Sequence, residues 1–323
     1  MSAAAALDRS GMSEKGTMRR AALWRNRLVL AGSSLVLLLV LAAWLAPFGV
    51  KAKWLRNPIQ QMSAGLDADG MPLPPGRQFL AGTDNFGRDV LSRVLHGTRV
   101  SLTVGVAAML VATIIGVWIG MLAGYWGGKM DLLLMRFTEM NMALPAILLA
   151  VALAGVMDGR VVHLHPAAWP WHGLDLQLKR GMVSLFLIIG LVCWPGMGRV
   201  IRGQVLAVKA REFVQASRAL GASDTRLILR HILPNILPTV LVVAVMLTAN
   251  AILLEAGLGY LGVGVPPPAP TWGSMLYEGQ AYFISAPHLV MVPGAAIVLT
   301  VLAFNLLGQG LQEWFDPTRE RRR

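Results

Sequence analysis

The residue types best suited to metal binding lie in one stretch of the chain, where His163, His165 and His172 precede Asp175. Imidazole and carboxylate groups can together ligate zinc. A His-x-His pair in a stretch rich in Trp and Pro is more typical of a surface or interfacial loop, so we expect no metal site here. The single cysteine, Cys193, excludes an internal disulfide and any multi-cysteine metal site.

Sequence motifs for catalysis are missing. The chain has no GxxxxGK[ST] phosphate loop, no HExxH and no GxSxG, which are the usual devices for phosphate binding, zinc hydrolysis and acyl transfer. We therefore expect a chain that is not an enzyme and carries no cofactor of its own.

The stretch from Arg211 to Asn235, REFVQASRALGASDTRLILRHILPN, predicts a helix, a break and a second helix. Gly221 can adopt the left-handed conformation that ends a helix, Ser223 can cap the next helix, and Asp224 suits its positive N-terminal end. Pro234 is expected to stop that helix. The small residues at the bend would fit a groove on another protein, although a solvated basic loop at a membrane surface explains the same pattern.

The elements that must position this loop are unusually apolar. Of 323 residues, 55% are hydrophobic and 14% charged, which is too apolar for a soluble domain of this size. Six segments without Asp, Glu, Lys or Arg approach the ~20 residues that cross a bilayer. We therefore expect an all-α integral membrane protein with six transmembrane helices: Leu28 to Ala46, Ser101 to Ala123, Met140 to Met157, Met182 to Gly198, Ile236 to Leu254 and Val290 to Leu307.

The distribution of positive charge predicts the orientation. The net charge is +12, and of the 29 Lys and Arg residues 19 fall in the two tails and the segments 124–139 and 199–235, against 10 on the other side. Cytoplasmic flanks carry such an excess, so both termini are expected in the cytoplasm. The predicted parts are a cytoplasmic tail (1–27), the first helix with an external segment (28–100), a five-helix core (101–311) containing the cytoplasmic loop 199–235, and a basic tail (312–323).

Small residues repeat within the second apolar segment. Gly116, Gly120 and Gly124 recur every four residues and would line one helix face, so that another helix can approach closely.

Several polar residues near the apolar segments could have a role. Asn141, Thr248 and Asn250 could face a polar pathway or could form hydrogen bonds between helices. Glu139 and Glu255 flank the third and fifth segments, where we expect them to be hydrated. In the external segment, Arg88, Asp89 and Arg93 could form exposed ion pairs that orient a surface or contact a binding protein.

The stretch after the fourth segment resembles the EAA loop of ABC importer permeases. Gln215, Ala216 and Ser217 precede Gly221 by the interval of that motif, and Leu233-Pro234 closes it; Gln215 stands where the family has Glu. By this resemblance the loop couples the permease to ATPase subunits through ten residues: Gln215, Ala216, Ser217, Ala219, Leu220, Gly221, Ala222, Ser223, Leu233 and Pro234.

Three further stretches are similar to the C-type second permease of dipeptide and oligopeptide importers. They are FLAGTDNFGRDVLSRVLHGTRVSL (79–102), GYWGGKMDLLLMRFTEMNMALP (124–145) and LEAGLGYLGVGVPPPAPTWGSML (254–276). The resemblance runs from about residue 28 to Pro317 and implies a multi-pass protein of the bacterial cytoplasmic (inner) membrane.

The resemblance also implies partners and a substrate. The expected partners are a homologous second permease subunit, two ATP-binding subunits that use ATP and Mg, an external solute-binding protein and membrane lipid, with no nucleic acid. Dipeptides or short oligopeptides are the expected cargo, and nickel, glutathione or another small solute remains open. A secondary transporter would commonly carry ionisable residues within its spans, and a membrane enzyme would need a reactive cluster that only the three histidines offer.

Overall fold

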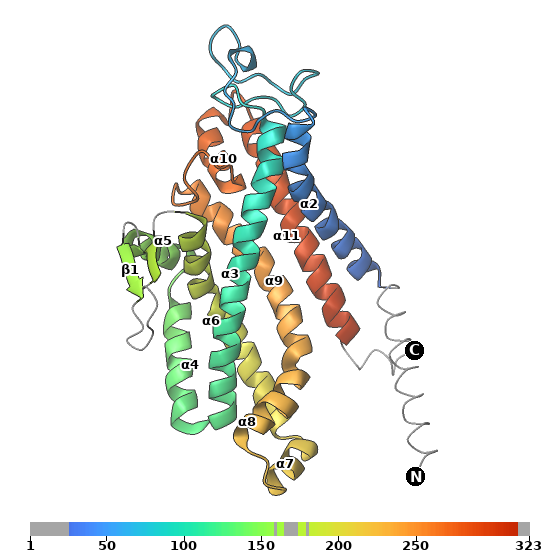
Figure 1. Ribbon diagram of the computed structural model, residues 1–323, viewed down its shortest axis with the longest axis vertical. Helices are drawn as coiled ribbons and strands as arrows, with labels where there is room; N and C mark the ends of the chain where they lie inside the picture. The colour runs from blue at the N-terminus through green and yellow to red at the C-terminus, as the bar shows by residue number, and fades with distance from the viewer. Residues whose placement is uncertain (1–25, 158–159, 165–173, 179–180, 316–323) are drawn as a thin grey trace.

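Five long helices make up most of the computed structural model, which describes residues 26–157, 160–164, 174–178 and 181–315 (Figure 1). They are α2 (Arg27–Lys51), α3 (Val90–Trp126), α6 (Met182–Lys209), α9 (Leu233–Tyr260) and α11 (His288–Phe315), and each is long and apolar enough to cross a membrane. Five of the six predicted spans are therefore confirmed. Pro195 and Pro293 lie inside α6 and α11 without ending them, as membrane helices tolerate.

The third predicted span is not one straight helix. The chain forms α4 (Gly128–Ala143) and α5 (Ala146–Met157), which meet at an angle of 95°. Leu144 between them has an extended backbone and precedes Pro145, and a residue before proline is sterically disfavoured from the helical region. The prediction of a continuous helix from Met140 to Met157 is wrong, and the bent pair makes the number of spans five or, if it crosses as one unit, six.

The predicted stop at Pro234 is also wrong. The short helix α8 (Asp224–Arg226) continues through a π-helical segment, η2 (Leu227–Ile232), directly into α9. Pro234 lies two residues after the π-helical segment, inside this continuous helical run, and such π adjustments are one way in which membrane helices tolerate the hydrogen bond that a proline cannot donate. The residues after the bend are therefore one extension of α9.

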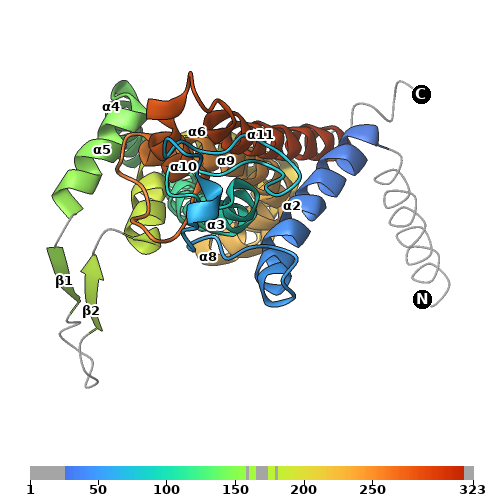
Figure 2. The same ribbon diagram turned by 90° about the horizontal axis from the view of Figure 1, so that it is seen from above.

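Smaller elements occupy the ends of the helices. The strands β1 (Arg160–Leu164) and β2 (Leu174–Leu178) form an antiparallel hairpin that the sequence did not predict and that projects away from the helices (Figure 2). His163 pairs in register with Asp175, whereas His165 and His172 lie outside the described residues, so the expectation about a metal site stays a prediction. The remaining elements are η1 (Ser63–Gly65), α7 (Glu212–Ala219), α10 (Trp272–Gly279) and η3 (Gln280–Tyr282).

The helices α3 and α6 pack closely along the glycine stripe. An added Cβ would lie 2.7 Å from the Cβ of Met197 at Gly116, 2.5 Å from the carbonyl oxygen of Gly198 at Gly120, and 2.8 Å from the Cβ of Val205 at Gly124. Such distances leave room for hydrogen alone. The predicted packing role of these glycines is confirmed, and it makes α3 and α6 one tightly joined pair.

Candidate functional site

The loop that resembles the EAA motif forms a compact hairpin at one end of the helices, built from α7 and α8 (Figure 1). Gly221 has φ = +83° and ends α7, and the Ser223 hydroxyl caps α8 by accepting a hydrogen bond from the amide of Arg226 at 3.4 Å. The predicted order of helix, break and helix is therefore confirmed. We call residues 212–226 the hairpin.

The hairpin presents small side chains and two large apolar side chains, Leu220 and the less exposed Phe213 (42%). Leu220, next to the bend, is 88% exposed, whereas Val214 and Leu227 are 2% and 0% exposed and pack into the core. Of the ten residues that the resemblance assigns to coupling, Ser217, Ala222 and Leu233 are half-buried and the rest are exposed: Gln215, Ala216, Ala219, Leu220, Gly221, Ser223 and Pro234. The hairpin therefore has a fixed inner face and an open outer face.

Two polar contacts hold the hairpin against the ends of α6 and α9. The Gln215 amide donates to the carbonyl of Lys209 at 2.8 Å, where α6 ends. A carboxylate could not make this bond because it has no hydrogen to donate, which gives Gln215 a function that the family's Glu would lack. Ser217 and His231 lie 3.3 Å apart and join α7 to the π-helical segment.

The sequence did not predict two further contacts near the hairpin, one between the hairpin and α3 and one between α6 and α4. The Tyr125 hydroxyl, in the last turn of α3, donates to Asp224 and accepts from Arg218 at 2.9 Å. The guanidinium of Arg202 on α6 holds both oxygens of Asp131 on α4 at 2.5 and 2.6 Å. Both Tyr125 and Asp131 lie in the stretch 124–145 that resembles the permeases of peptide importers, and this resemblance was the only sign in the sequence that they have a role.

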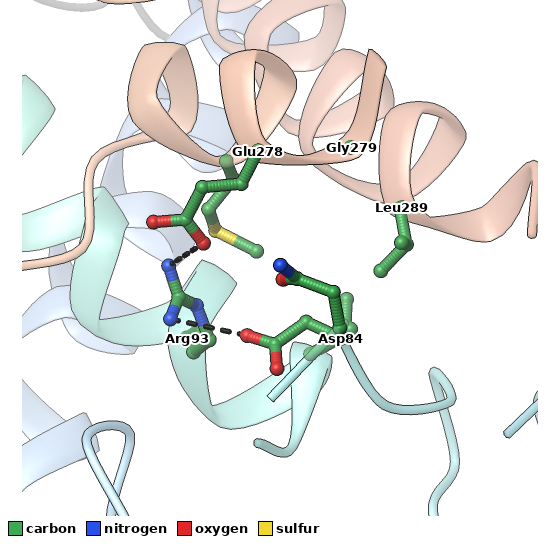
Figure 3. Close-up of a pocket in the computed structure, with 8 residues that line it drawn as sticks. Asp84, Arg93, Glu278, Gly279 and Leu289 are labelled. Atoms are coloured by element: carbon green, nitrogen blue, oxygen red, sulfur yellow. Dashed lines mark hydrogen bonds and ion pairs between the residues drawn. The ribbon is translucent and has the colours of Figure 1, made fainter. Parts of the chain in front are cut away.

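The opposite end of the molecule carries a buried network of charges (Figure 3). Nη1 of Arg93 lies 3.1 Å from Asp84 and its Nη2 lies 2.8 Å from Glu278, so one guanidinium bridges two carboxylates. Arg88 contacts the same two acids at 2.6 and 2.5 Å. Two positive and two negative charges thus join the segment before α3 and the start of α3 to α10.

This network corrects the prediction of exposed ion pairs. Arg88 and Arg93 are only 8% and 2% exposed. Neither of their partners was singled out from the sequence: Asp84 lies four residues before Arg88, and Glu278 lies 190 residues after it. Asp89 instead caps α3, accepting from the amide of Ser92 at 3.0 Å, and burial raises the pKa of its carboxyl above the usual range.

The residues considered for a translocation pathway are dispersed. Thr248 is buried, and its hydroxyl donates to the carbonyl of Ala244 in its own helix at 3.0 Å. Asn250 is exposed on α9, and Asn141 is half-buried near the end of α4. The structure therefore does not gather the three into one site.

The two glutamates differ in environment. Glu139 is exposed and pairs with Arg136 at 3.0 Å, in line with hydration. Glu255 is 0% exposed, so its predicted hydration is wrong. The hydroxyls of Ser101 and Thr271 are its polar neighbours, yet both Glu255 oxygens are buried without a hydrogen-bond partner among the described residues.

Relatives with similar sequences cover almost the whole chain. A protein of Brucella abortus biovar 1 named as a peptide transport system permease is 38% identical over 301 residues, covering 93% of this chain and 90% of that protein. The glutathione transport system permease protein GsiD of Pectobacterium atrosepticum is 34% identical over 302 residues, covering 91% and 89%. GsiD of Escherichia coli O6:K15:H31 is 35% identical over 297 residues, covering 91% and 87%.

A chain of a solved structure is similar in fold to this chain. A chain of the MetNI methionine ABC transporter, in an inward-facing conformation, superposes with a TM-score of 0.54 at 16% identity, covering 69% of this chain and 97% of that chain. The model of the family described as binding-protein-dependent transport system inner membrane component matches residues 116–321. The chain belongs to this family and is a multi-pass inner-membrane permease of an ABC importer.

Proposed function

We propose that this permease imports dipeptides or short oligopeptides and forms half of the translocation pathway. Family membership supports import, and the names of the relatives support the cargo, since one is named for peptide transport and two for glutathione, which is itself a tripeptide. The other half of the pathway is a homologous second permease, and an external solute-binding protein delivers the cargo.

Two separate ATP-binding subunits drive the transport. The chain lacks a phosphate loop of its own, and the hairpin offers an outer face shaped for docking. The hairpin end of the molecule is cytoplasmic, because seven of the Lys and Arg residues fall between residues 199 and 235. The end with the buried charges, around Arg93, is then external.

The mechanism is alternating access. ATP binding closes the two ATPase subunits, the hairpin moves with them, and the helices that it contacts change their tilt. ATP hydrolysis then resets the inward-facing state. The observation that carries this proposal is Leu220, which is 88% exposed at the tip of a hairpin whose inner face is buried; an apolar side chain fixed in that position fits a partner's groove.

Gly221→Asp tests the docking. Aspartate tolerates the left-handed backbone better than most residues, so the variant mainly adds a charged side chain to the tip, where a Cβ meets nothing within 4 Å. We expect ATP-driven uptake to be lost while the protein remains in the membrane. Gly70→Asp is the matched control, because Gly70 also has a positive φ and open surroundings but lies far from the hairpin in sequence and outside the predicted coupling loop.

Transport and assembly are measured in parallel on membranes that contain the complete importer. Copurification of ATP-binding subunits with the wild-type chain supports the proposal, and transport by the purified chain alone would contradict it. Uptake of labelled dipeptide, tripeptide, glutathione and nickel ion identifies the cargo. Unimpaired uptake by the Gly221→Asp variant would exclude the docking role of the hairpin.

A further inference from the structure

The hairpin is connected by the chain to α6 and α9, yet it also contacts α3. It follows α6 after Lys209 and leads into α9 through the π-helical segment. Tyr125 in the last turn of α3 reaches it across sequence separations of 93 and 99 residues. A third helix, remote in sequence, is therefore attached directly to the hairpin.

One hydroxyl group makes this attachment on both sides of the bend. The Tyr125 hydroxyl donates to Oδ1 of Asp224, in the first turn of α8, and accepts from Nη2 of Arg218, in the last turn of α7, at 2.9 Å. Arg218 and Asp224 themselves are 3.6 Å apart. Because both partners are charged, these hydrogen bonds are stronger than neutral ones.

The ring that carries this hydroxyl is held firmly. Tyr125 is 3% exposed and packs with the buried residues of α6 and α9. The Lys209 ammonium donates to the backbone carbonyl of Tyr125 and lies 5.3 Å from the ring centroid. The neighbouring Gly124 lies against Val205 of α6, with no space for a Cβ. A displacement of the hairpin at the hydroxyl is therefore passed to α3 rather than absorbed by a side-chain rotation.

We propose that Tyr125 is a positioning residue that transmits the movement of the hairpin to α3. The inference rests on the proposed function, in which ATP-binding subunits move the hairpin. Without the Tyr125 hydroxyl, the hairpin still docks through its outer face and still follows α6 and α9. The movement of α3, however, no longer keeps pace with ATP hydrolysis.

Tyr125→Phe tests this inference because it deletes the hydroxyl and keeps the ring. The complete importer is reconstituted in proteoliposomes, and solute uptake and ATP hydrolysis are measured on the same vesicles. We expect uptake per ATP hydrolysed to fall about tenfold, the effect of losing one hydrogen bond to a charged group, while ATP hydrolysis persists. Tyr260→Phe is the matched control, since Tyr260 lies at the other end of α9 and is 45% exposed, and its ratio should equal that of the wild type.

A double-mutant cycle identifies the partner. The Asp224 side chain is 61% exposed and Ser223 caps the helix, so Asp224→Ala should fold. If Tyr125 acts through Asp224, the double variant should have the ratio of the more impaired single variant. The inference is overturned if Tyr125→Phe leaves the ratio of uptake to ATP hydrolysis unchanged. It is also overturned if the reductions of this ratio in the two single variants multiply in the double variant, or if the complex fails to assemble and uptake and hydrolysis fall equally. A wild-type complex without ATP-dependent uptake would instead overturn the proposed function.

Discussion

Replacing Arg93 with alanine should destabilise the protein strongly, because its guanidinium bridges two carboxylates in the interior of the end opposite the hairpin. The Arg93 side chain is 2% exposed, and its partners Asp84 and Glu278 are 6% and 21% exposed. Removing one partner from a buried ion pair costs about 3–5 kcal/mol, since the remaining charge stays buried without compensation. Arg88 still contacts both acids at 2.6 and 2.5 Å, so we expect a loss of about 3 kcal/mol, the low end of that range.

The exposed pair Arg136–Glu139 provides the matched control. It also joins an arginine to a glutamate, at 3.0 Å, but the side chains are 71% and 56% exposed. Exposed pairs contribute about 0–1 kcal/mol, so Arg136→Ala should unfold close to the wild type. Arg93→Lys should not restore stability, because an ammonium group cannot present the planar fork that reaches both carboxylates.

A single thiol makes the measurement direct. Cys193 is the only cysteine of the chain, lies within α6 and is partly buried, so reaction with a fluorogenic thiol reagent during heating reports when α6 opens. The purified wild type and the three variants are compared in the same detergent. Equal melting temperatures for Arg93→Ala and Arg136→Ala would refute the reasoning, and so would a full rescue by Arg93→Lys.

Two further predictions use the same assay. Gly120→Ala should lower the free energy of unfolding by about 1–3 kcal/mol through overpacking, because the added Cβ would lie 2.5 Å from a backbone carbonyl oxygen of α6. Gly203→Ala is the control and should melt at or above the wild-type temperature, because a Cβ there meets nothing within 4 Å. Equal losses of stability in the two variants would contradict the packing argument. Glu255→Leu should melt at or above the wild-type temperature, because both Glu255 oxygens are buried without a hydrogen-bond partner among the described residues and an apolar side chain removes the cost of burying them. A melting temperature clearly below that of the wild type would show that a partner of the carboxyl group stabilises this site.

The positions of the bends and of the buried charges depend on tertiary contacts. Periodicity could not show that Met140 to Met157 turns by 95° at Pro145, because the segment is free of charged residues on both sides of the proline. Nor could it show that Pro234 lies within a continuing helix, since the effect of a proline depends on whether a local π-helical adjustment compensates for the hydrogen bond that it cannot donate. Arg88 and Arg93 looked exposed in the sequence because their second acid, Glu278, is brought to them only by the packing of α10 against α3.

The sequence by itself determined the apolar segments, the glycine face of α3, the bend at Gly221 and the family, because each depends on residue types at short spacing. Only the tertiary structure decided which distant groups share a site, as Tyr125 does with Asp224 and the buried Arg93 with Glu278. The physical reason is that a buried charge or hydroxyl is stable only with a partner. That partner is selected by the approach of helices distant in the chain.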